Sequence, residues 1–211
     1  NSAALNILLD QGKTINVKVF NNGKLQMTGV PHENGGIKAA NIVIDLIKSI
    51  PDNGINGKKI VFDKKRLEIK NYRTVLINSD YFCGMEIQRE HLYQILSEDY
   101  DLSVSYESEN YPGVKLEYFW NKNTINTPFE GRCNCSKKCL GKGLGNGDND
   151  CKKVTVSSFQ SGKVIVTGAR SRDQINNAYN FINKIFQDNY QIIRKKNSSN
   201  KSKIKKLNRL I

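Results

Sequence analysis

Residues 17–29 and 156–168 repeat one pattern, Phe-x-x-Gly-Lys followed after three residues by Thr-Gly. Each copy precedes a segment whose apolar residues recur every three or four positions, as in a helix with one apolar face. Those residues are Ile37, Ala40, Ile44 and Ile47 in the first copy and Ile175, Ala178, Ile182 and Ile185 in the second. Each copy therefore predicts a strand, a tight glycine turn, a second strand and a helix packed on the sheet. We expect these helices over residues 37–50 and 173–186.

The predicted strands have one apolar face, because successive strand residues point to opposite sides of a sheet. The residues expected on the helix-covered side are Ile15, Val17, Val19, Leu25, Met27, Val154, Val156, Val164 and Val166. The other side then carries Phe20 with Lys24 in one copy and Phe159 with Lys163 in the other. An exposed apolar ring lowers solubility, and exposed apolar patches commonly mark binding surfaces. The recurrence of this Phe in both copies therefore favours a binding role for the helix-free side. The alternative is that both Phe side chains cap the core at a turn.

Three segments give the chain a resemblance to a known family. They are residues 106–113 (Tyr-Glu-Ser-Glu-Asn-Tyr-Pro-Gly), 159–170 around the second Gly-Lys turn, and 87–96. They resemble the stirrup, the most recognisable strand pair and the short first helix of the second repeat in the TATA-binding protein (TBP) family. The divergent composition is similar to that of TBP-like proteins of large DNA viruses.

The resemblance implies an α+β fold, the TBP-like saddle of two pseudo-repeats. Its curved antiparallel sheet is expected to be continuous, with helices on the convex face. In this family the concave face lies in the DNA minor groove, and aromatic wedges unstack base steps and bend the duplex.

Site residues follow from matching these motifs position by position. The DNA-binding set implied by the resemblance is Phe20, Lys24, Thr28, Tyr111, Pro112, Phe159, Lys163, Ile165, Thr167 and Arg170. The family contacts the B-type general transcription factor through its stirrup, and the matching residues here are Glu107, Glu109 and Asn110. The resemblance therefore implies two protein partners, the B-type factor and RNA polymerase. The chain departs from the family pattern at Tyr111, which replaces a Phe wedge, and at Glu117, where a basic phosphate contact is expected.

Charge and repeats together suggest the domain limits. We expect an N-terminally truncated first repeat over 1–50, a connection over 51–73, a second repeat over 74–190 and a basic disordered tail over 191–211. The formal net charge is +13, and the last segment contains eight Lys or Arg and no acid. Such a polycation attracts phosphates without sequence preference, although it could also serve only to solubilise the chain.

The second repeat contains an insertion over 121–152 that the family lacks. Cys133, Cys135, Cys139 and Cys151 lie in it, and four thiolates can close a tetrahedral zinc site. A metal would give this Gly-rich, polar segment its main source of order. The alternatives are disulfides, which an intracellular protein disfavours, and a mobile loop without metal. Cys83 is expected to be a small buried residue of the core rather than a ligand.

Other classes of protein fit the sequence less well. There are two His, His32 and His91, and no pattern pairs a nucleophile with a base, so we expect no enzyme. No apolar run is long enough for a transmembrane helix, and no signal peptide is visible. We therefore expect a monomer that binds double-stranded DNA in a reducing compartment: the host nucleus, a viral factory or the virion. Two alternatives remain, a protein-interaction subunit that keeps the saddle without specific DNA binding, and a single-strand binder that stacks bases on its aromatic residues.

Overall fold

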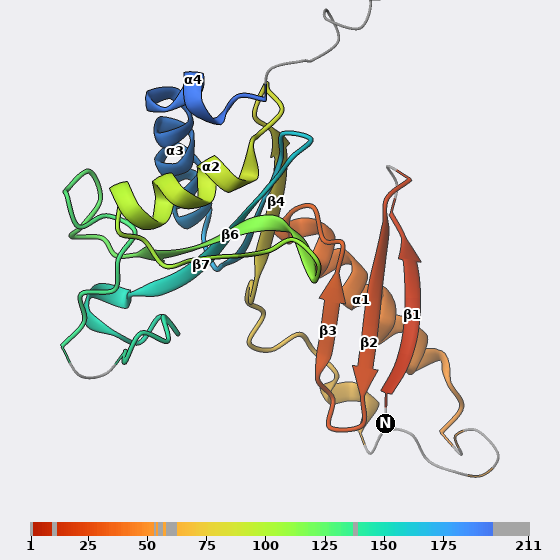
Figure 1. Ribbon diagram of the computed structural model, residues 1–211. Helices are drawn as coiled ribbons and strands as arrows, with labels where there is room; N and C mark the ends of the chain where they lie inside the picture. Colours follow the sequence, from red (N-terminus) through yellow and green to blue (C-terminus); the bar gives the residue numbers. More distant parts are fainter. Residues whose placement is uncertain are drawn as a thin grey trace, which may run out of the picture. The chain divides into compact units, whose positions relative to one another are not determined.

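The computed structural model describes residues 2–9, 12–52, 54, 57, 63–136 and 139–195. It divides into two compact units, Asn1–Thr74 and Val75–Ile211. Each unit contains an antiparallel sheet with helices packed on one face (Figure 1). None of the helices in the described ranges is long and apolar enough to span a membrane.

The first unit is a small sheet covered by one long helix. Strands β1 (Ser2–Leu8), β2 (Thr14–Phe20) and β3 (Leu25–Thr28) form the sheet in the order β1-β2-β3. Helix α1 (Glu33–Ser49) starts at His32, whose Nδ1 accepts a hydrogen bond from the Gly35 amide at 3.0 Å. A short 3-10 turn, η1 (Lys64–Arg66), follows. Ile15 and Val17 of β2 pack with Ala39 and Val43 of α1 in the core.

The second unit is larger and has five strands in the order β4-β8-β7-β6-β5. The strands are β4 (Ile77–Phe82), β5 (Val104–Glu107), β6 (Tyr111–Trp120), β7 (Lys152–Phe159) and β8 (Lys163–Ala169). Helix α2 (Arg89–Gln94) continues into a π-helical turn, η2 (Ile95–Asp99), and α3 (Arg172–Asp188) leads to α4 (Tyr190–Ile193). A 3-10 turn, η3 (Asp148–Asp150), lies in the insertion.

One core joins the helices to a single face of the five-stranded sheet. Val154, Val156, Val164 and Val166 are all buried. They pack with α2, α3 and α4, through residues that include Leu92, Ala178, Ile182, Ile185 and Ile193. The predicted faces are thus confirmed for β7, β8 and α3, and the helix-free side is defined by the alternate residues of the same strands. A side-chain hydrogen bond also joins the sheet to α3, because Trp120 Nε1 donates to Asn177 Oδ1 at 3.0 Å.

Three expectations from the sequence need correction. The described strands form two separate sheets rather than one continuous sheet. In α1 the most buried residues are Ala39, Ala40 and Val43, whereas Ile37 and Ile44 are half-buried. Ala39 and Val43 form the contact with Ile15 and Val17 of β2, so Ile37 and Ile44 lie beside that contact.

The third correction concerns the start of the basic tail, which was expected at residue 191. Residues 190–193 form α4, and Ile193 is fully buried in the second core. The Ile87–Arg194 bridge and the bond from the Lys195 amide to the Glu86 carbonyl at 2.9 Å extend this packing. The lysines and arginine from residue 196 onward lie outside the described residues.

Candidate nucleic-acid interface and metal centre

The two aromatic residues predicted as wedges in the second repeat lie against each other. Tyr111 begins β6, Phe159 ends β7, and their ring centroids are 5.6 Å apart. Gly113 pairs with Phe159 across the two strands. A Cβ at Gly113 would lie 2.9 Å from the Tyr111 ring and 3.1 Å from the Phe159 ring. The absence of a side chain at Gly113 therefore lets both rings pack over the backbone. Pro112 follows Tyr111 and is exposed.

Lys115 adds a charge beside this pair. Its Nζ lies 3.9 Å from the centroid of the Tyr111 ring, within the range of a cation–π contact. Lys115 lies two residues after Gly113 and therefore shares the helix-free face of β6. A cation and two packed, mutually tilted rings thus occupy the same end of the sheet.

The other predicted DNA-contacting residues of β7 and β8 lie on the same helix-free face, paired across neighbouring strands. Ser157 pairs with Lys115 on one side and Ile165 on the other, and Thr155 pairs with Thr167. Ile165 and Thr167 are half-buried and alternate with the buried Val164 and Val166. The structure therefore brings Tyr111, Phe159, Ile165 and Thr167 onto one continuous surface.

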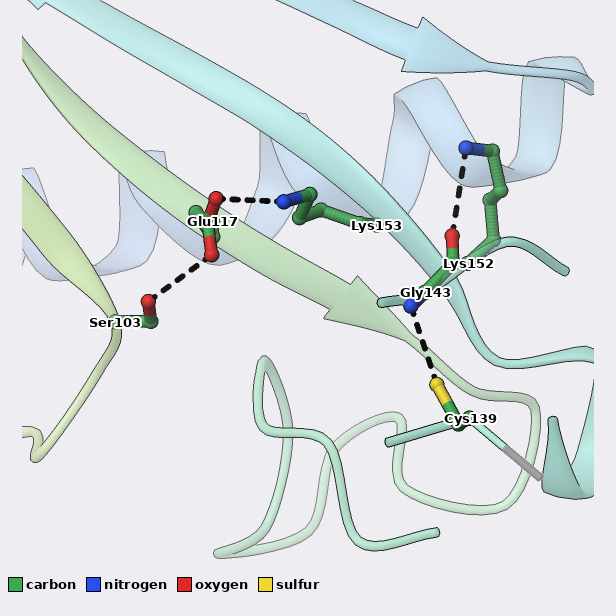
Figure 2. Close-up of polar contacts among 6 residues, drawn as sticks. All are labelled: Ser103, Glu117, Cys139, Gly143, Lys152 and Lys153. Atoms are coloured by element: carbon green, nitrogen blue, oxygen red, sulfur yellow. Dashed lines mark hydrogen bonds and ion pairs between the residues drawn. The ribbon is translucent and has the colours of Figure 1, made fainter. Parts of the chain in front are cut away.

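Two lysines of this surface are paired with acids. Lys163 Nζ lies 3.1 Å from Asp80 Oδ2, and Lys153 Nζ lies 2.7 Å from Glu117 Oε1. Ser103 Oγ donates to the second Glu117 oxygen at 3.1 Å, as Figure 2 shows. Glu117, which stands where the family resemblance implies a basic phosphate contact, is therefore compensated by a lysine of the adjacent strand. The carboxylates of Asp80 and Glu117 are therefore each neutralised by a neighbouring lysine.

The stirrup is a tight hairpin turn between β5 and β6. Asn110 Nδ2 donates to Glu107 Oε2 at 3.0 Å across this turn, and Glu109 between them is exposed. Helix α2 supports the hairpin, since Arg89 Nη1 donates to the Pro112 carbonyl at 2.7 Å. The three predicted partner-binding residues therefore lie together at an exposed tip that is attached to the helix layer.

The first unit carries its own version of the pattern. Phe20 ends β2 and is half-buried, and its amide donates to the Lys24 carbonyl at 2.9 Å across the turn. Lys24 and Thr28 are exposed, and Thr28 pairs with Asn16. Both repeats thus place a Phe at the turn that joins two neighbouring strands.

Arg170 lies apart from the other predicted groove residues. It borders a cleft of about 720 Å³ at the N-terminus of α3, which Trp120, Lys122 and Lys152 also line. Burial lowers the pKa of Lys152, and the positive charges of Arg170 and Lys153 lower it further. The cleft adjoins the beginning of β7, whereas Phe159 stands at the other end of that strand.

The four cysteines of the insertion converge. Their sulfur atoms all lie within 4.8 Å of one another, so the cluster could hold a metal ion. The Sγ–Sγ distances are 3.6 Å for Cys133–Cys139, 3.8 Å for Cys139–Cys151 and 3.9 Å for Cys151–Cys133. Four sulfurs at about 2.3 Å from a central zinc would stand about 3.8 Å apart, whereas a disulfide requires about 2.05 Å. Burial raises the pKa of the Cys151 thiol.

Gly143 attaches the cluster to the sheet. Its amide donates to Cys139 Sγ at 3.1 Å (Figure 2), and its carbonyl accepts from the Lys153 amide at 2.8 Å. The φ of Gly143 is +57°, and a Cβ there would lie 2.5 Å from the Lys153 amide nitrogen. Only glycine fits between the cluster and β7. Phe119 of β6 packs on Cys139 and Cys151, and these three residues form a small cluster separate from the main core of the unit.

Several residues of the site were not expected from the sequence. Phe82 and Asp80 of β4 share the helix-free face, because they pair with Lys163 and Ile165 of β8. Lys153 was not singled out either, although its odd number in β7 matches Thr155 and Phe159. The alternation rule applied to β4 and to the start of β7 would have found all three.

The fold and the site define a class of protein. Two related units, each with an antiparallel sheet and helices on one face, give the α+β architecture of the TBP-like fold. A family model described as transcription factor TFIID, or TATA-binding protein, matches residues 147–189. TBP-family proteins are DNA-binding transcription factors.

Two individual proteins are similar to the chain over most of its length. A "TATA-box-binding protein-like" protein of Acanthamoeba polyphaga mimivirus is 26% identical over 182 residues, which cover 85% of this chain and 45% of the relative. The chain therefore spans about half the length of the curated relative it matches. A solved structure of Methanococcus jannaschii TBP covers 88% of this chain and 78% of its own, with 19% identity and a TM-score of 0.48. The predicted resemblance to the TBP family is confirmed: the chain is similar to a viral TBP-like protein, and a TBP family model matches part of its second unit.

Proposed function

We propose that this protein is a transcription initiation factor that binds duplex DNA through the helix-free faces of its sheets and bends it at the minor groove. The observation that carries the proposal is the Tyr111–Phe159 pair, two half-buried rings held 5.6 Å apart over Gly113. Proteins that kink DNA from the minor groove insert apolar side chains between base steps. Tyr111 fits this role if its hydroxyl stays hydrated or hydrogen-bonded. No enzymatic activity is proposed, in keeping with the family.

Other parts of the structure support the recruitment of protein partners. The exposed tip of Glu107, Glu109 and Asn110 offers two carboxylates and an amide on a supported hairpin. A B-type general transcription factor with a basic surface would complement it, and RNA polymerase would follow in the same assembly. The protein would act as a monomer in a reducing compartment of the infected cell.

A second candidate function is a protein-interaction subunit that retains the fold without specific DNA binding. The pairing of Lys163 with Asp80 and of Lys153 with Glu117 favours it, because paired lysines attract phosphates less than free ones. The two functions differ in what the helix-free face contacts.

We also propose that Cys133, Cys135, Cys139 and Cys151 hold one structural zinc ion. The sulfur atoms of Cys133, Cys139 and Cys151 are 3.6–3.9 Å apart, as in a zinc tetrahedron, and that of Cys135 lies within 4.8 Å of each of them. The amide of Gly143 is placed to stabilise a thiolate at Cys139. Four protein ligands fill the coordination shell, so the ion would order the insertion rather than activate water.

Binding to AT-rich and GC-rich duplexes at two salt concentrations tests the proposed function. We expect tighter binding of the AT-rich duplex and a fall in affinity with salt. The same AT-rich strand without its complement should bind more weakly. Equal, weak binding of all probes with retained binding of a B-type factor would favour the protein-interaction function.

A further inference from the structure

An aromatic residue outside the predicted set occupies the helix-free face of the second unit. Phe82 ends β4 and is 66% exposed, which is unusual for a side chain of this size and apolarity. It pairs with Lys163 of β8, and the neighbouring Asp80 pairs with Ile165. Phe82 therefore points to the side of the sheet that carries Phe159 and Ile165.

The ring of Phe82 has a fixed place beside the Phe159 turn. A Cβ at Gly162 would lie 2.7 Å from Cε2 of Phe82, so this ring covers the backbone of Gly162. Gly162 belongs to the same turn as Phe159, because its amide donates to the Phe159 carbonyl at 2.9 Å. The Cys83 amide also donates to the Gly162 carbonyl at 2.9 Å, which fixes the end of β4 against the turn.

The order of the strands gives the spacing of the aromatic residues. Strand β8 separates β7 from β4, so the backbones of Phe159 and Phe82 are two strand spacings apart, about 10 Å. Lys163 lies between them and is held by Asp80 at 3.1 Å. The exposed ring of Phe82 therefore lies next to a lysine whose charge is already neutralised by an acid. This end of the surface suits deoxyribose rings and base edges better than phosphates.

We propose that Phe82 is a third aromatic contact with duplex DNA, packing on the sugar–base edge beside the step opened by Tyr111 and Phe159. The inference rests on the proposed function, since it extends the same face. Duplex DNA is favoured as the occupant because Phe82 continues a surface already carrying two rings and Lys115. A Phe82 contact would add affinity that is insensitive to salt, since no counterion is released.

The test compares Phe82→Ala with the matched control Phe129→Ala, a second exposed Phe, 57% exposed, in the insertion. We expect Phe82→Ala to weaken binding to an AT-rich duplex about 5- to 150-fold, the range of one base–aromatic contact. The slope of log affinity against log salt should stay unchanged. Phe129→Ala should bind like the wild type, and Phe82→Tyr, which keeps the ring, should retain most of the affinity.

Three results would overturn the inference in distinguishable ways. Equal affinities of Phe82→Ala and the wild type would refute the Phe82 contact while leaving the proposed function intact. Equal losses in Phe82→Ala and Phe129→Ala would show an effect that is not specific to this face. Failure of the wild type to bind any duplex would refute the proposed function and the Phe82 contact with it. Thermal unfolding of each variant shows whether the fold is retained.

Discussion

Replacing Glu117 by Gln should increase DNA affinity and make it more sensitive to salt. The carboxylate lies 2.7 Å from Lys153 Nζ on the helix-free face, so each charge cancels the other there. The substitution removes the negative charge and releases one lysine for a phosphate. One additional phosphate contact steepens the slope of log affinity against log salt by about 0.9 for B-form DNA. The advantage over the wild type should therefore shrink about 3.5-fold between 50 and 200 mM salt.

The fold should survive this change. The side chains of Lys153 and Glu117 are 34% and 39% exposed, so water screens the ion pair. Such pairs contribute on the order of 0–1 kcal/mol to stability. Affinities would be measured by fluorescence anisotropy of a labelled AT-rich duplex at four salt concentrations.

Glu98→Gln is the matched control for Glu117→Gln. Glu98 is exposed in η2, on the helix layer rather than the free face, and the substitution changes the net charge equally. We expect its slope to equal that of the wild type. Identical slopes for all three proteins would refute the placement of Glu117 and Lys153 at the DNA interface.

Three further predictions concern the insertion. Elemental analysis of the purified wild-type protein should give about one equivalent of zinc per chain, and the Cys135→Ser/Cys139→Ser variant should contain less than about a tenth of an equivalent. A metal-free wild type, or equal zinc in both proteins, would contradict the site. DNA bending should survive this double substitution, since the cluster precedes β7 and the wedge Phe159 ends it; loss of bending in a folded double variant would refute that separation. Gly143→Ala should lower zinc affinity, because a Cβ would lie 2.5 Å from the Lys153 backbone. The matched control is Gly141→Ala, where nothing lies within 4 Å of the Cβ position, and competition with a chelator measures the zinc affinity of both variants. Equal affinities would contradict the role of Gly143.

Much of the second unit could be predicted from local sequence. Alternation placed Val154, Val156, Val164 and Val166 on the helix side, and the motif match brought Tyr111 to Phe159. Strand parity depends only on a period of two, so it holds wherever a strand is regular.

Features that depend on tertiary contacts could not be predicted in the same way. In α1 the buried stripe runs through Ala39 and Val43, which contact β2, rather than through the isoleucines. The compensation of Glu117 by Lys153 joins two strands whose register the sequence does not state. Phe82 is different, because alternation along β4 places it on the helix-free face; it was missed because β4 belongs to no repeated motif that would draw attention to it.

The bend angle of an AT-rich duplex, measured by energy transfer between its labelled ends, tests the central claim most directly. We predict that wild-type protein shortens the end-to-end distance and that the Tyr111→Ala/Phe159→Ala variant loses most of this bend. The variant should still bind, since Lys115, the other surface lysines and the basic residues near the C-terminus remain. A bend unchanged in the double variant, or a wild-type complex with straight DNA, would contradict the wedge role of the Tyr111–Phe159 pair.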